Sequence, residues 1–219
     1  MKRRNILCCG IISLSLAGLT ACDEHEYIEP YTIGNSVLCE DGEIMDTTSC
    51  RLTGETPIAV VFYTKGDSVY AVWLKETAAL AFSDHTAGIQ GTSLSVTSDV
   101  GFTNTANLLK NDSIKSPIAE ATVGIWSAGQ SAFVPSVNEM NLLQQHAVEV
   151  NQVLQWCQTV YPSSGTVLLP LSEQNCWYWT STEVSSTHAY LYSIRRCYSE
   201  QSTPKVQAHK ARPIVIVRK

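Results

Sequence analysis

Two apolar runs in the first half of the chain predict a β-hairpin. Residues 58–63 are continuously apolar, residues 68–74 are mostly apolar, and Thr64-Lys65-Gly66-Asp67 between them is a turn sequence. Neither run has helical spacing, and each is as long as an ordinary strand. Residues 78–98 are low in charge and rich in Ser, Thr and Gly, which predicts a long loop or irregular strands.

A helical pattern dominates the middle of the chain. Ser136 and Glu139 have the spacing of a capping box, in which each side chain binds the backbone N–H of the other residue. Apolar residues recur at helical spacing from Met140 to Cys157, in two sets separated by His146. We therefore expect two helices, or one broken helix, between Ser136 and residue 158. A further short helix is expected over residues 104–110.

The last part of the chain returns to a strand pattern. Residues 176–182 are aromatic and β-prone, and residues 188–194 alternate between two faces. Residues 211–218 predict a terminal strand, in which Pro213 belongs at an edge or at the strand start. One or two helices, several short strands and long loops together predict an α+β fold.

The amino-terminal residues change this picture, because they have the order of a bacterial lipoprotein signal. Basic residues 2–4 precede an apolar stretch over residues 6–19, and Leu19-Thr20-Ala21-Cys22 resembles the lipobox. This resemblance implies removal of residues 1–21 and a diacylglycerol on Cys22. Each buried CH₂ contributes about 0.8 kcal/mol, so several acyl chains anchor firmly. An ordinary cleaved signal peptide is the alternative.

The charge of the chain is acidic overall and unevenly distributed. The chain has 15 basic and 20 acidic residues, and loss of the three bases at positions 2–4 leaves 12 against 20. This acidic balance argues against a nucleic-acid role. Residues 23–26, Asp-Glu-His-Glu, resemble the surface-export signals of Bacteroidetes lipoproteins, while a solvated tether is the plainer interpretation. The expected location is the outer membrane, with lipid anchoring through Cys22, and the sequence leaves open whether the protein faces the cell surface or the periplasm.

Cysteine usage fits an oxidising compartment, although the number after the lipobox is odd. Cys39 and Cys50 flank a turn-rich stretch and are candidates for one disulfide. Cys176 and Cys197 flank a predicted hairpin and are candidates for a second. Cys157 then stays a thiol on the apolar face of a helix. The spacings lack the Cys-x₂-Cys pattern of zinc sites, so no metal is expected.

Four segments resemble one family by their order along the chain. They are Phe133 to Met140 (FVPSVNEM), Trp177 to Glu183 (WYWTSTE), Ala189-Tyr190 and Ala211-Arg212-Pro213-Ile214. Their order is similar to that of the Lcl C-terminal domain family, also called DUF1566, over about residues 130–219. One departure is Ala132-Phe133, where the family usually has Trp-Arg.

This resemblance implies a C-type-lectin-like fold, with small mixed or antiparallel sheets, one or two helices and long loops. It also implies recognition at a surface. The expected organisation is a signal peptide over residues 1–21, an acidic tether over residues 22–32 and a single lectin-like domain over residues 33–219. Calcium-dependent sugar binding is not supported, because the Glu-Pro-Asn and Gln-Pro-Asp triplets are absent.

The candidate ligand contacts cluster near the last predicted strands. They are Arg195, Arg196, Tyr198 and Lys205, together with His188. Arginine forks bind carboxylates and sulfates in a bidentate manner, and aromatic faces stack on sugars. A solvated basic hairpin tip without a ligand is the alternative.

The expected function is therefore non-enzymatic recognition of a glycan or a protein ligand by a lipid-anchored surface protein. The chain has no G-x-S-x-G, H-E-x-x-H or P-loop motif, and no catalytic residue or cofactor beyond the lipid is expected. Cys157 with His188 is a formal thiol and base pair, but a core thiol is the plainer interpretation. The alternative function is a structural or accessory component of a surface assembly, such as a fimbrial tip or an outer-membrane complex. The sequence leaves the oligomeric state open.

Overall fold

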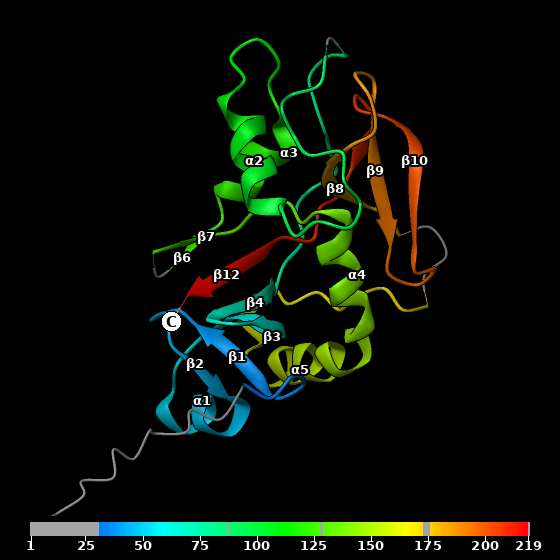
Figure 1. Ribbon diagram of the computed structural model, residues 1–219. Helices are drawn as coiled ribbons and strands as arrows, with labels where there is room; N and C mark the ends of the chain where they lie inside the picture. The colour runs from blue at the N-terminus through cyan, green and yellow to red at the C-terminus, as the bar shows by residue number, and fades with distance from the viewer. Residues whose placement is uncertain (1–30, 87, 128, 173–175, 219) are drawn as a thin grey trace, which may run out of the picture. The chain divides into compact units, whose positions relative to one another are not determined.

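The structure, a computed structural model, describes residues 31–86, 88–127, 129–172 and 176–218 (Figure 1). One compact unit extends from Tyr31 to Lys219. Its described residues form five α-helices and small antiparallel sheets, so the α+β class is confirmed. The predicted signal peptide, Cys22 and the acidic tether up to residue 30 lie outside the described residues. The expected number of one or two helices is wrong, because short helices also form where the sequence has no long apolar periodicity.

The larger sheet is built around the predicted hairpin. β3 (Pro57–Lys65) and β4 (Ser68–Trp73) pair from Lys65 and Ser68 inward, and the two-residue turn between them contains Gly66 with a φ of +56°. The strand order is β12-β4-β3-β1-β2, with every neighbouring pair antiparallel. The other members are β1 (Ser36–Cys39), β2 (Ile44–Asp46) and β12 (Ile214–Arg218). β12 is an edge strand that begins directly after Pro213, as predicted.

Two consecutive helices pack on one face of this sheet (Figure 1). α4 (Val137–Gln145) and α5 (Ala147–Val160) are separated at His146, so the predicted break is confirmed. The predicted capping box at the start of α4 is also present in both directions. Val60 and Phe62 of β3 alternate toward these helices and share a core with their buried apolar side chains, which are Val137, Met140, Leu143, Ala147, Val150, Val153, Leu154 and Cys157.

The opposite face of the sheet carries a second apolar layer. Val61 of β3 and Ala71 of β4 belong to it, together with the buried Ala132 and the half-buried Ile125. The segment from Ile125 to Ala132 contains a small hairpin of β6 (Trp126–Ser127) and β7 (Gln130–Ser131). Both faces of the central strands are therefore apolar, which explains the continuous apolar runs in the sequence.

A second sheet has the order β10-β9-β8. Its strands are β8 (Tyr178–Glu183), β9 (His188–Ser193) and β10 (Tyr198–Pro204). All six residues of β8 are buried, because Tyr178 packs into the core beneath α4 and α5 while Trp179 packs into a third cluster with Phe82. This cluster also receives Leu108 of α2 (Gly101–Lys110) and Ile118 of α3 (Pro117–Val123). The six residues of β8 are therefore part of the core on both of its sides.

The remaining elements are short. α1 (Thr47–Thr53) begins at Asp46, whose carboxylate accepts hydrogen bonds from the backbone N–H groups of Thr48 at 2.9 Å and Ser49 at 3.0 Å. Within residues 78–98 the described chain contains a single two-residue strand, β5, so this region is mainly loop. The other pieces are β5 (Leu80–Ala81), its partner β11 (Ala208–His209) and a 3₁₀ turn (Pro162–Ser164).

Candidate functional site

The turn between β9 and β10 brings three of the predicted contact residues together. Arg195 and Arg196 are exposed in this turn, and Tyr198, at the start of β10, is 52 % exposed. The Arg196 guanidinium carbon lies 5.6 Å from the centroid of the Trp177 ring, and Trp177 meets Tyr198 edge to face at 6.5 Å. Trp177 was not among the contact residues expected from the sequence. We call Trp177, Arg195, Arg196 and Tyr198 the hairpin tip.

The other two predicted contact residues lie at the opposite end of the same hairpin. Tyr198 pairs with Ser193, whereas His188 pairs with Pro204, next to Lys205. At about 3.3 Å per residue, the two ends are separated by well over 10 Å. The exposed site expected from these five residues is therefore divided, and Lys205 is not a surface residue.

Lys205 is buried because a carboxylate inside the protein binds it. Its ammonium group pairs with Glu183 and also donates to the carbonyl oxygens of Gly88 at 3.0 Å and Ser186 at 3.2 Å. His188 stays partly exposed, with its Nδ1 2.7 Å from the Thr187 hydroxyl. These hydrogen bonds connect Lys205 and His188 to neighbouring loops. Of the five residues predicted to contact a ligand, Arg195, Arg196 and Tyr198 are the ones exposed together in the hairpin tip.

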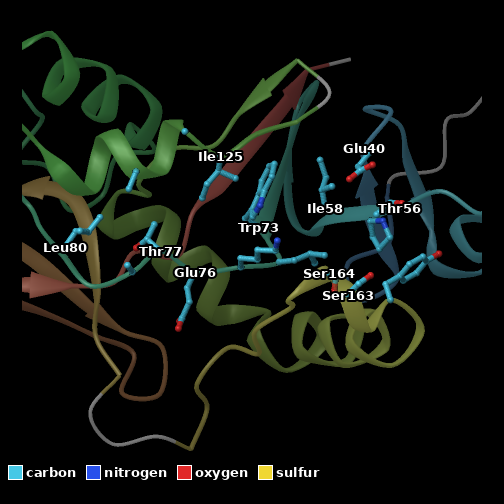
Figure 2. A pocket seen from close by; sticks show the side chains of 17 residues that line it. Glu40, Thr56, Ile58, Trp73, Glu76, Thr77, Leu80, Ile125, Ser163 and Ser164 are labelled. Atoms are coloured by element: carbon cyan, nitrogen blue, oxygen red, sulfur yellow. The ribbon is translucent and has the colours of Figure 1, made fainter.

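A groove of about 710 Å³ lies at one end of the larger sheet, where no binding site was predicted. Figure 2 shows Trp73 and Ile58 along one wall, with Ile125 on the side of α3 and with Ser163 and Ser164 facing them from the 3₁₀ turn. The lining thus combines apolar side chains with hydroxyl groups. Its parts come from β3, β4, α3 and the 3₁₀ turn, so no local motif marks it.

Charged side chains lie along the same groove. Glu40, Lys75 and Glu76 belong to its lining, and Figure 2 shows Glu76 pointing away from Trp73. Glu76 is held from outside the groove, because the Tyr178 hydroxyl donates to its Oε2 at 3.0 Å and Lys210 pairs with its Oε1. A groove of this volume and mixed lining suits an extended segment or a small ligand.

The cysteines are placed differently from one another. Cys39 on β1 and Cys50 on α1 are buried thiols with their Sγ atoms 3.6 Å apart, so the proposed partners are neighbours in space. Cys197 is exposed in the hairpin turn, and Cys176 is half-buried. Both disulfides stay predictions.

The thiol of Cys157 does not have the character of a nucleophile. Burial within the core raises its pKa to about 12, which keeps it protonated at neutral pH. It lies on α5 among apolar side chains, in agreement with the plainer interpretation of this residue.

Within the described ranges, no group of three or more His, Cys, Asp or Glu residues is arranged to hold a metal ion. No helix in the part of the chain that the structure describes is long and apolar enough to cross a bilayer. The predictions on calcium, cofactors and the lipid anchor stay predictions.

Comparisons with known proteins add one finding about the fold. No family model and no curated protein matches the chain, so its resemblance to the Lcl C-terminal domain family and the C-type-lectin-like fold stay predictions. A solved structure described as a fimbrial protein from Bacteroides ovatus is similar in fold, with a TM-score of 0.58 at 13 % identity. The match covers 84 % of this chain and 48 % of that protein, so this chain spans about half the length of its neighbour.

Proposed function

We propose that this protein is a lipid-anchored subunit of a surface assembly of the fimbrial type. The observation that carries the proposal is the fold similarity to a fimbrial protein over 84 % of this chain. The lipoprotein-like signal ending at Cys22 is consistent with such a location, because surface subunits must be exported and retained. This role corresponds to the alternative function derived from the sequence, rather than to adhesion by an isolated protein.

In this proposal the groove beside Trp73 contacts a segment of another subunit. It offers Ile58, Trp73 and Ile125 as apolar contacts, with the hydroxyl groups of Ser163 and Ser164 opposite. Apolar anchors surrounded by polar groups are the usual arrangement of a protein–protein contact.

The test is incorporation of the full chain into surface filaments. Cells that produce it are sheared, and the released filaments are examined by immunogold electron microscopy and immunoblotting. Ile125→Glu in the groove is expected to reduce incorporation at least several-fold, whereas Val148→Glu on the exposed side of α5 is not. Absence of the wild-type chain from every filament fraction contradicts the proposal.

A second candidate function rests on the hairpin tip. Arg196 above the Trp177 ring, with Tyr198 exposed beside it, has the chemistry of a site for sulfated or carboxylated glycans. Glycan recognition by a subunit of a surface assembly is compatible with the first proposal, because the tip and the groove do not share residues.

A further inference from the structure

A second cavity, of about 610 Å³, lies between β4, β12 and the start of α2. Its walls include Tyr70, Phe102, Phe133 and Ile216, and its acids are Asp99 and Glu139. It shares no residue with the groove beside Trp73 or with the hairpin tip. We call it the Glu139 pocket.

Glu139 is unusual because only one of its two carboxylate oxygens is used. Its Oε2 accepts hydrogen bonds from the backbone N–H groups of Ser136 at 2.7 Å and Gly101 at 3.1 Å. Its Oε1 is buried and accepts no hydrogen bond from the residues that the structure describes, and the residue as a whole is 1 % exposed. A buried carboxylate oxygen without a donor is costly, so a donor brought by a ligand would stabilise this arrangement.

The other charged groups around the pocket have different roles. Asp99 is engaged on both oxygens, by Lys65 at 2.9 Å and by the Asn138 side-chain amide at 2.6 Å. Arg218 is exposed where it contributes to the lining. Both oxygens of Asp99 thus already have partners, whereas Glu139 retains an unused acceptor.

The raised pKa of Glu139 is consistent with a site for a positively charged ligand. Burial is the main cause that raises its pKa to about 7, and the neighbouring Asp99 adds to the shift. Burial and the charges of Glu139 and Asp99 also raise the pKa of the Tyr70 hydroxyl, so Tyr70 stays neutral. Near neutral pH a cation in the pocket favours the ionised form of Glu139.

The aromatic walls favour the same kind of ligand. Phe102 and Phe133 meet edge to face with centroids 5.8 Å apart, and Phe102 is 60 % exposed. Aromatic faces attract cations, and their carbon surface contacts the methylene groups that carry an ammonium. We propose that the Glu139 pocket binds a primary ammonium group, which donates a hydrogen bond to Glu139 Oε1.

The first experiment is titration of the full chain, solubilised in detergent, with methylammonium by ligand-observed NMR at constant ionic strength. Sodium at the same concentration is the control cation. Methylammonium stays charged from pH 6 to pH 8, whereas Glu139 ionises across this range, so affinity is expected to be about tenfold higher at pH 8. Lys65 and Tyr70 do not titrate in this window, because contacts with Asp99 raise the pKa of Lys65 and burial raises the pKa of Tyr70.

Variants distinguish the pocket from general electrostatic attraction. Glu139→Gln retains an amide oxygen for the two backbone N–H groups but removes the charge, so it is expected to abolish methylammonium binding. The matched control Glu120→Gln removes an exposed acid of α3 and is expected to leave binding unchanged. Equal binding by wild type and Glu139→Gln, or binding of methylammonium no stronger than that of sodium, overturns the proposal. Should Glu139→Gln fail to fold, pH-independent binding by the wild type overturns it equally.

Two further probes identify the source of the ammonium group. Nα-acetyl-lysine amide represents a lysine side chain of a protein, and glucosamine represents an amino sugar, with N-acetylglucosamine as its uncharged control. The probe that displaces methylammonium more strongly shows whether the pocket prefers a lysine side chain or an amino sugar. Competition by N-acetylglucosamine as strong as that by glucosamine contradicts recognition of the ammonium itself.

Discussion

Lys205 and Glu183 form an ion pair in the interior of the protein, with side chains that are 1 % and 0 % exposed. Glu183 also accepts hydrogen bonds from the backbone N–H of Gln90 at 2.9 Å and from the Thr92 hydroxyl at 2.7 Å. The pair therefore attaches the loop around Gln90 to the end of β8 and to the residue after β10. Because both charges have several partners, the desolvation cost of each is offset.

Replacement of Lys205 by Met is expected to destabilise the protein by about 3–5 kcal/mol, because it leaves the Glu183 carboxylate buried without its counter-charge. The free energy of unfolding is measured by urea denaturation. Lys65→Met is the matched control, since Lys65 pairs with Asp99 at the surface, and it should change little. The double variant Glu183→Gln/Lys205→Met should regain part of the lost stability. A single Lys205→Met variant as stable as the control would show that the pair contributes nothing.

Gly101→Ala is expected to destabilise the protein by roughly 1–3 kcal/mol through overpacking at the start of α2. A Cβ at this position would lie 2.2 Å from Glu139 Oε2, 2.8 Å from the Phe133 ring and 2.9 Å from the Ser136 nitrogen. Gly124→Ala at the end of α3 is the control, because its Cβ would meet only ordinary contacts at 3.5 Å. Thermal melting should give a lower melting temperature for Gly101→Ala than for Gly124→Ala. Equal melting temperatures would contradict the close approach of α2 to Glu139.

Stability is expected to fall as the pH rises from about 4.5 to about 7, through the titration of Glu139. Burial raises the pKa of this carboxyl to about 7 from 4.5, so within this window the folded state holds a proton that the unfolded state releases. The loss is on the order of 3 kcal/mol and levels off above pH 7. Urea unfolding of wild type and Glu139→Gln at several pH values isolates this loss. The free energy of unfolding of the variant should rise relative to that of wild type as the pH rises. A difference independent of pH would contradict the raised pKa.

The parts of the fold that the sequence predicted are those governed by local interactions. The capping box at Ser136, the helix break at His146 and the β3–β4 hairpin each depend on residues a few positions apart. α1 and α3 were missed because seven residues are too few to show a helical period, although Asp46 and Pro117 are start signals.

The burial of Lys205 could not be read from the alternation of the strand before it. The register of the β9–β10 pairing shifts between Glu200 and Thr203. Glu200 pairs with Leu191 and Thr203 pairs with Ala189, so β10 has one more residue than β9 in this interval. One extra residue reverses the faces of all positions that follow, so a basic residue expected at the surface turns inward. The groove and the Glu139 pocket were equally hidden, because each collects side chains from four or more separate segments.

Cys39 and Cys50 are expected to form a disulfide when the protein is exported to an oxidising compartment. Their Sγ atoms are 3.6 Å apart, and an oxidant that carries a disulfide would join them by accepting two electrons and two protons, which convert it to a dithiol. The short loop between them predicts a gain of roughly 2–3 kcal/mol. Peptide mapping after alkylation detects the bond, and a reductant should lower the urea midpoint of wild type more than that of Cys39→Ser, which retains Cys176 and Cys197. Alkylation of both thiols in exported protein would contradict the pairing.

Binding of the hairpin tip to sulfated glycans is expected to depend on its two arginines. A charge-assisted hydrogen bond contributes about 1.5–3 kcal/mol, so Arg195→Ser/Arg196→Ser should weaken binding roughly tenfold or more. The control is Arg51→Ser/Lys110→Ser, which removes two exposed bases from other surfaces and should have little effect. Surface plasmon resonance across salt concentrations separates electrostatic attraction from stacking on Trp177 and Tyr198, because only the former is screened. If both double variants lose binding equally, the attraction is a property of the net charge rather than of the tip, and the groove beside Trp73 becomes the surface to examine for partners.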